Sequence, residues 1–198
     1  GEDTLLICET CGYAANRQIA RFSKSPLPTE DPKPLEKVAT PGAKTIQALA
    51  DFLGVPESKT AKAVFVVASI PHGQESMERL VFAILRGDME VNETKLANAL
   101  KARELRPARE DEISAVGAVP GYASPVGIKG VTVVVDDLIP QSMNLVAGAN
   151  ETGYHYLNVN YGRDYQADLV VDIASAEEGS ACPDCSSLMK DVRGVEVG

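Results

Sequence analysis

The sequence predicts an α/β fold, with a single mixed, curled β-sheet, surrounding helices and a small appendage. Three observations predict this class. Several short apolar runs are rich in valine, which is typical of buried strands. Other segments repeat their apolar residues with the period of a helix. The two kinds of segment do not alternate regularly, which argues against a repeated βα unit.

The length and net charge of the chain limit its size class and its possible binding partners. With 198 residues, 44% of them hydrophobic, the chain can bury the core of one sizeable domain with an appendage. Its net charge of −9 argues against a self-sufficient nucleic-acid-binding protein. One group of cations has two explanations: it either lies on solvated helix faces or forms a local basic patch. These cations are Lys95, Lys101, Arg103, Arg106 and Arg109.

The sequence also bears on location. No apolar run approaches the roughly 18 residues of a membrane span, and the start lacks the features of a signal peptide. We therefore expect a cytoplasmic protein without a membrane partner. The first residue is not methionine and the chain stops abruptly, which suggests a piece of something longer.

The four cysteines form two Cys-x-x-Cys pairs, Cys8 with Cys11 and Cys182 with Cys185. Two thiolates from each tight turn make the tetrahedral set that zinc prefers, so we predict a structural zinc site that joins the two chain ends. Redox dithiols and idle surface cysteines are the alternatives. Four thiolates leave no position open for a substrate, so we expect no chemistry there.

The first part of the chain predicts a linker and a helix. Residues 23–36 contain four prolines, which indicates an extended linker. Residues 43–53 predict a helix, because an apolar stripe runs at i, i+3, i+4 and i+7 from Ile46 and stops before Gly54. A short helical turn over residues 56–60 follows.

The next segment predicts the central strands. Residues 63–68 are continuously apolar and indicate a strand buried on both faces. Lys62 precedes this strand, and a lysine there is costly to bury unless it has a partner or a task. The alternative is that Lys62 snorkels to solvent. Residues 69–78 predict a loop, and residues 79–86 predict a second strand that pairs with the first as a wide hairpin.

Two helices and a loop come next. Asn92 is a good N-cap for a helix that reaches about residue 101, and residues 109–116 predict another short helix. Residues 117–130 hold four glycines and two prolines, which suits either a loop whose amides approach a ligand or a plain connector.

Further strands are predicted at 131–136, 143–149, 154–161 and 168–173. In the third of these, alternation places His155, Leu157 and Val159 opposite Tyr154 and Tyr156. We divide the chain accordingly into an N-terminal zinc knuckle or neck (1–22), the proline-rich linker (23–36), the main domain (37–175) and a C-terminal zinc knuckle or neck (176–198).

Several motifs in a fixed order resemble a known family. They are Pro34-Leu-Glu-Lys-Val-Ala-Thr-Pro-Gly, Lys59-Thr-Ala-Lys-Ala-Val, Arg86-Gly-Asp-Met-Glu-Val-Asn-Glu-Thr-Lys95, Gly121-Tyr-Ala-Ser-Pro-Val-Gly127, Ala147-Gly-Ala-Asn-Glu-Thr-Gly-Tyr-His-Tyr156, Asn160-Tyr-Gly-Arg-Asp164 and the closing Arg193-Gly-Val-Glu-Val-Gly. Nearly the whole chain resembles the inserted editing domain, with its flanking neck, of bacterial-type prolyl-tRNA synthetase, in the aminoacyl-tRNA deacylase family.

The resemblance implies hydrolytic editing of mischarged tRNA for proline, chiefly alanyl-tRNA. It implies the tRNA acceptor end and the remainder of a synthetase chain as partners. No catalytic cofactor is implied, since ATP would serve only the parent ligase, whose activity we do not expect from this chain. The family's essential lysine matches Lys62, and the substrate-binding positions match Gly121, Pro125, Gly127, Asn150 and His155. Asn144 departs from the family, where we would expect an acid.

Ester hydrolysis needs a placed water, a proton acceptor and stabilisation of the oxyanion. We expect amides of the 121–127 loop to stabilise the oxyanion. Lys62 is a poor base as an ammonium, so we expect it to position the phosphate or ribose or to steady the oxyanion, with the substrate's own groups activating the water. His155 is expected in the pocket, although a lone inward histidine is often a satisfied core group.

Selectivity is expected to follow size, because a pocket that admits a methyl group can exclude a pyrrolidine ring. The alternative function is a non-catalytic tRNA-binding or partner-binding module held by a zinc ribbon. The paired cysteines favour that alternative and the net acidity weakens it.

Overall fold

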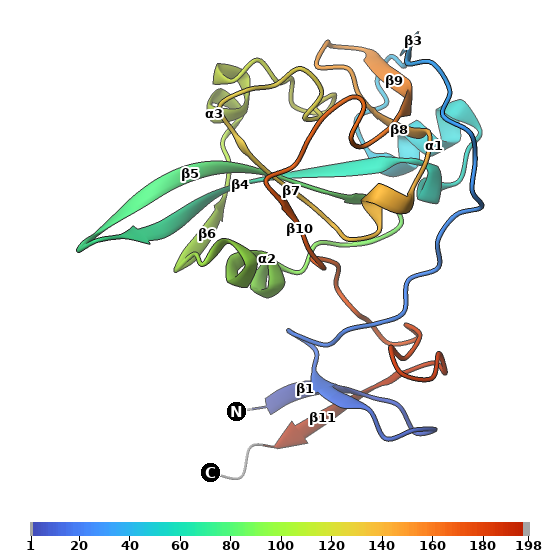
Figure 1. The fold of residues 1–198 in the computed structure, drawn as a ribbon, viewed down its shortest axis with the longest axis vertical. Coiled ribbons are helices and arrows are strands. Elements are labelled where there is room, and N and C mark those ends of the chain that lie inside the picture. Colours follow the sequence, from blue (N-terminus) through green and yellow to red (C-terminus); the bar gives the residue numbers. More distant parts are fainter. Residues whose placement is uncertain (1, 196–198) are drawn as a thin grey trace. The chain divides into compact units, whose positions relative to one another are not determined.

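The computed structural model describes residues 2–195 and divides into two compact units. One unit combines residues up to Ser25 with those from Ala174 onward, and the other is Pro26–Ile173 (Figure 1). Position 1 and the last three residues of the closing motif, 196–198, lie outside the described residues. No helix in the described part is both long and apolar enough to cross a membrane.

The larger unit is built on a five-stranded sheet in the order β10-β7-β5-β4-β6. Its strands are β4 (Ala61–His72), β5 (Glu75–Arg86), β6 (Glu104–Pro107), β7 (Thr132–Val135) and β10 (Leu169–Val170). β4 pairs antiparallel with β5 and β6, whereas β7 pairs parallel with β5 and β10. The mixed α/β class predicted from the sequence is therefore confirmed.

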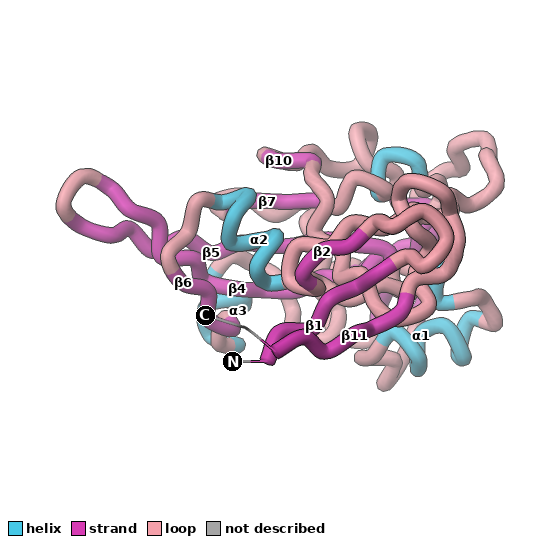
Figure 2. The backbone as a smooth tube through the Cα atoms, turned by 90° about the horizontal axis from the view of Figure 1, so that it is seen from below, coloured by secondary structure: helices cyan, strands magenta, loops and turns pink. Residues whose placement is uncertain are grey.

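The β4–β5 hairpin corrects one prediction. Residues 69–78 were expected to form a loop, but pairing continues to His72 opposite Glu75, so only a tight turn separates the strands. β6 pairs with β4 only over Val66–Ser69, and beyond that point the hairpin is a two-stranded ribbon (Figures 1 and 2). A ribbon without a covered face needs no apolar run, which explains why the hydrophobic pattern did not reveal it.

A second sheet lies in the same unit. It has the order β3-β9-β8, with β3 at Glu36–Ala39, β8 at Leu145–Gly148 and β9 at Tyr154–Val159. An isolated bridge between Thr60 and Val146 links β8 to the segment that enters β4. The strands of this unit thus fall into two sheets, where the sequence had suggested one. The short strands β3 and β6 were not predicted, because neither carries a strong apolar pattern.

The described residues form three α-helices beside the sheets: α1 (Ile46–Leu53), α2 (Glu93–Leu100) and α3 (Glu110–Ala115). Single 3₁₀ turns occur at Glu57–Lys59 and Ile139–Gln141. Thr45 caps α1 by accepting a hydrogen bond from the Ala48 amide, and Asn92 caps α2 in the same way, as predicted for Asn92. Gly54 ends α1 in the left-handed region, also as predicted.

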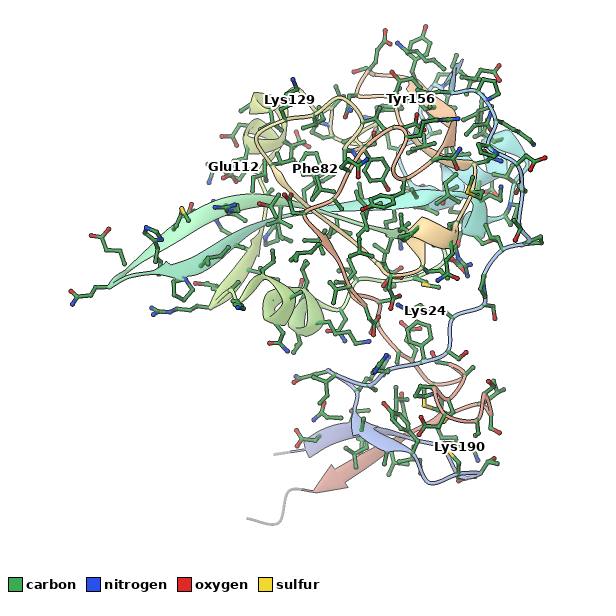
Figure 3. The ribbon with its side chains drawn as sticks, in the orientation of Figure 1. Lys24, Phe82, Glu112, Lys129, Tyr156 and Lys190 are labelled. Carbon is green, nitrogen blue, oxygen red and sulfur yellow. The ribbon has the colours of Figure 1, made fainter. Side chains whose placement is uncertain are left out.

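The core lies on both faces of the five-stranded sheet. Alternate β5 residues contribute to each face, with Val81 packing toward Leu96 of α2 and Phe82 packing toward Ile113 of α3 (Phe82 is labelled in Figure 3). β4 was expected to be buried on both faces, but Ala63–Phe65 is only half-buried. Ala63 and Phe65 line a cavity, which leaves them partly exposed.

The smaller unit is held by a three-stranded sheet, β11-β1-β2. β1 (Glu2–Ile7) pairs antiparallel with β11 (Lys190–Val195) and with β2 (Ala14–Asn16), so the two ends of the chain meet in one sheet (Figure 2). Its core is small and contains Leu6, Cys8, Ala20, Ala176, Cys182 and Met189.

Candidate active site

A cavity of about 210 Å³ lies between the N-terminal end of α1, the start of β4 and the strands β8 and β9. Its wall is apolar except for two lysines, a threonine and a histidine. The lining residues are Lys44, Thr45, Ile46, Leu49, Ala61, Lys62, Ala63, Phe65, Gly121, Ala123, Gly148 and His155. Three of the positions singled out from the sequence, Lys62, Gly121 and His155, therefore border one space.

Lys62 borders the cavity while its ammonium is already bonded. Nζ donates to the carbonyl oxygen of Met89 at 2.8 Å and to Glu90 Oε1 at 2.8 Å. The Lys62 side chain is 18% exposed, whereas that of Glu90 is 69% exposed. An ion pair with so exposed a carboxylate is weak, typically about 0–1 kcal/mol. Lys62 can therefore exchange Glu90 for a ligand at little cost.

His155 is held at the cavity wall by Thr40. The imidazole is buried, and its Nδ1 lies 2.6 Å from the Thr40 hydroxyl. Burial lowers the pKa of His155 to about 4, so the ring is neutral at pH 7. Thr40 is fully buried and its hydroxyl has no other partner among the described residues. We therefore assign the Thr40 hydroxyl as donor to Nδ1, which leaves Nε2 protonated and able to donate into the cavity.

The loop after α3 forms the opposite wall and is clamped by Asn150. The Asn150 side chain donates to the carbonyls of Ser124 and Val126 and accepts from the Ser124 amide, at 3.0–3.1 Å. Its own amide donates to the carbonyl of Tyr122 at 2.8 Å. Asn150 thus shapes the loop and is not itself among the residues that line the cavity.

Gly148 on β8 lets this loop approach closely. A β-carbon at Gly148 would collide with the carbonyl of Tyr122 and lie 2.6 Å from the Ala123 nitrogen. Because the loop packs directly on the β8 backbone, Gly121 and Ala123 reach the cavity. The amides of Gly121 and Ala123 have no hydrogen-bond partner within residues 2–195. These two amides are the candidates for an oxyanion site.

Residues 40–165, more than half of the chain, match the family model described as the aminoacyl-tRNA editing domain. The chain belongs to the aminoacyl-tRNA editing domain family. It is 54% identical over 200 residues to a proline–tRNA ligase of Salinispora tropica and 48% identical over 198 residues to one of Dehalococcoides mccartyi. Each alignment covers this whole chain and 33% of the relative, so the chain spans about a third of their length.

The fold of the editing domain recurs in solved structures. A candidate trans-editing enzyme for prolyl-tRNA synthetase aligns with a TM-score of 0.56 at 16% identity, over 72% of this chain and 87% of the other. At that identity the likeness concerns the fold alone.

The other predicted positions of the editing domain lie away from the main cavity. Pro125 lines a smaller apolar space of about 10 Å³, which shares Ala61, Ala63 and Ala123 with the main one. Gly127 lines neither space and turns the loop with a φ of 75°. The structure therefore places Gly127 and Asn150 in shaping the loop rather than in the cavity wall.

The Asn144 side chain binds other segments of the chain and does not line the cavity. Its side chain donates to Asp31 O and accepts from the Lys33 amide, at 2.9 and 3.0 Å, and also bonds Asn160. Glu30 in the same segment pairs with Lys59 at 2.6 Å. These bonds fasten the extended, proline-rich segment to the larger unit.

Sequence reasoning missed four residues of the site: Thr40, Lys44, Tyr122 and Gly148. All four lie in or beside the motifs that carry the family resemblance, but nothing in their local pattern assigns them a task. Tyr122 is buried beside His155, with ring centroids 5.4 Å apart, and its hydroxyl accepts from the Gly42 amide at 3.0 Å. Such contacts depend on tertiary packing, which periodicity does not report.

In the smaller unit, the four cysteines gather at one point. All four Sγ atoms lie within 4.8 Å of one another, with Cys8 and Cys185 3.4 Å apart and Cys11 and Cys182 3.6 Å apart. Four sulfurs bound to zinc at about 2.3 Å would be roughly 3.8 Å apart. The cluster therefore fits a tetrahedral four-cysteine zinc site.

Proposed function

We propose that this chain is the editing domain of a proline–tRNA ligase and hydrolyses mischarged tRNA for proline, chiefly alanyl-tRNA. One observation carries the proposal. Lys62, Gly121 and His155, which the family resemblance marks independently of any structure, border the same cavity. The partners are the tRNA acceptor end and the remainder of the synthetase, in the cytoplasm.

The cavity offers groups that can stabilise the oxyanion and hold the ester, but it offers no base. The free amides of Gly121 and Ala123 suit a developing oxyanion, and Nε2–H of His155 donates to an ester or ribose oxygen. Lys62 adds positive charge beside the reacting ester. Since Lys62 is an ammonium and Nε2 carries a proton, neither removes a proton from water, and the substrate's own groups take that role.

Selectivity follows from the size of the cavity. Ile46, Leu49 and Phe65 line the cavity with apolar side chains, which suit a methyl group. A pyrrolidine ring is bulkier than a methyl group, so we propose that proline is excluded sterically.

The test is deacylation of alanyl-tRNA for proline, with prolyl-tRNA as the control substrate. The wild type should release alanine and spare proline. Lys62→Ala should abolish release while its melting temperature stays close to that of the wild type. Lys129→Ala, which removes a surface lysine outside the cavity (Figure 3), is the matched control and should hydrolyse normally.

Full activity of Lys62→Ala would refute the role of Lys62. Tight tRNA binding without turnover would favour the alternative, a non-catalytic binding module. If the chain alone neither binds nor hydrolyses, the assay is repeated in a full-length ligase that contains it, and absence of editing there would refute the proposed function.

We also propose that the four cysteines hold a structural zinc ion. Zinc there would join the two ends of the chain by bonds from Cys8, Cys11, Cys182 and Cys185. It would supply folding free energy to a small core and leave no coordination position for a substrate.

A further inference from the structure

Lys44 is a cation at the cavity that no described residue neutralises. Its side chain lines the cavity and is exposed, and its ammonium makes no ion pair or hydrogen bond with the described residues. None of the lining residues is acidic. Lys62, the other lining lysine, is paired with Glu90. Of the two lining lysines, Lys44 is therefore the one without an ion-pair partner among the described residues.

The backbone and stem of Lys44 are held in place. Its amide donates to the carbonyl of Gly42 at 3.0 Å, and the Ala43 amide donates to the carbonyl of Thr40. Its aliphatic carbons lie across Gly121, where a β-carbon would come within 3.1 Å of Lys44 Cγ. The turn that carries Lys44 is thus the turn that positions His155 through Thr40, and the stem of Lys44 packs on the opposite wall.

We propose that Lys44 binds the phosphate on the 5′ side of the terminal adenosine of the tRNA. This inference rests on the proposed function and extends it to a residue that the sequence did not single out. The aminoacyl ester is carried on the ribose of that adenosine, so its own 5′ phosphate is the anion nearest the reacting ester. In this proposal the aminoacyl end enters the cavity and the 5′ phosphate lies outside it, where Lys44 is exposed.

A lysine suits this task because a phosphate in water-accessible surroundings is held well by a single charged donor. The contact would act in binding and positioning, since the phosphate does not change charge during ester hydrolysis. Removing Lys44 is therefore expected to raise KM more than it lowers kcat. The effect should also weaken as salt screens the ammonium.

The test compares two small substrates, the 3′-O-alanyl esters of adenosine 5′-monophosphate and of adenosine. The wild type should hydrolyse the phosphorylated ester with a kcat/KM about tenfold higher, the scale of one charged hydrogen bond. Lys44→Ala should lose this preference, so that its ratio of kcat/KM between the two esters falls to about one. Lys44→Arg should restore part of the preference, and the control Lys129→Ala should keep all of it.

The outcomes separate this inference from the proposed function. If the wild type hydrolyses both esters equally, or Lys44→Ala keeps the preference for phosphate, the role of Lys44 is refuted while deacylation stands. If the wild type hydrolyses neither ester, the binding of adenosine 5′-monophosphate and adenosine is measured by calorimetry. Tighter binding of the monophosphate that vanishes in Lys44→Ala supports the site, and equal binding of both refutes it.

Discussion

At the scale of single residues, His155 makes the stability of the folded chain depend on pH. Its pKa is about 4 in the folded chain because the ring is buried, against about 6.5 when unfolded. Between these values the unfolded state holds a proton that the folded state lacks, so this residue makes stability fall as pH drops from 6.5 toward 4. Above pH 6.5 its contribution, on the order of 3 kcal/mol, is complete.

An NMR titration measures this directly. The chain has two histidines, and His72→Gln leaves a single imidazole signal that belongs to His155. We expect that signal to titrate near pH 4 and its ¹⁵N shifts at pH 7 to report the Nε2–H tautomer. Titration near pH 6.5 would contradict the burial argument, and an Nδ1–H tautomer would contradict the hydrogen bond assigned to Thr40.

Gly148 makes a second prediction at this scale. Gly148→Ala should force the loop off β8, because the new methyl group collides with the backbone at Tyr122 and Ala123. We expect the free energy of unfolding to fall by about 1–3 kcal/mol and deacylation to fall with it. Gly194→Ala is the control, since its β-carbon would meet no atom nearer than 3.9 Å. Equal denaturation midpoints for the two variants would show that the loop can move away from β8 with little loss of stability.

Single residues also show how much of the candidate site the sequence can predict. Lys62 could be singled out because a charge beside a continuous apolar run is unusual. His155 was placed inward by alternation, and the structure buries it. Lys44 and Thr40 carry no comparable pattern, since an exposed lysine and a threonine before proline are ordinary. Their significance comes from neighbours distant in sequence, Gly121 and His155.

At the scale of elements, the wall that carries Gly121 and Ala123 depends on one side chain. Asn150→Asp keeps the acceptor for the Ser124 amide but places a carboxylate oxygen against the carbonyls of Ser124 and Val126. Leaving these partly buried carbonyls unmatched should cost about 1–3 kcal/mol in the free energy of unfolding. Because the loop supplies the proposed oxyanion site, kcat of deacylation should also fall.

Asn158→Asp is the matched control, since Asn158 has a similar left-handed φ and a single side-chain bond, to Pro34 O. It should change both quantities much less. If Asn150→Asp lowers stability but leaves kcat unchanged, the loop amides do not stabilise the transition state.

The elements themselves were predictable where their pattern is strong. The central strands, α1 and α2 were anticipated because burial imposes a period and caps mark the ends. The distal β4–β5 ribbon and the short strands β3 and β6 were not, because exposed or edge strands need no apolar face. The cavity lies between two sheets. Its position depends on how distant strands pair, and no local sequence pattern predicts that pairing.

At the scale of the molecule, the described chain consists of two units with separate cores. All residues that line the main cavity belong to the larger unit, and all four cysteines belong to the smaller one. A core as small as that of the smaller unit gains much from a structural metal. Zinc and hydrolysis should therefore be separable.

The purified chain is expected to contain about one zinc ion, measured by mass spectrometry, and Cys182→Ser should lose it. That variant should melt earlier in the smaller unit, followed through amide exchange of β1 and β11, yet still hydrolyse the alanyl ester. Lys62→Ala should show the reverse, with full zinc content and no hydrolysis. Loss of hydrolysis together with zinc would mean that the larger unit needs the smaller one to keep its cavity in shape.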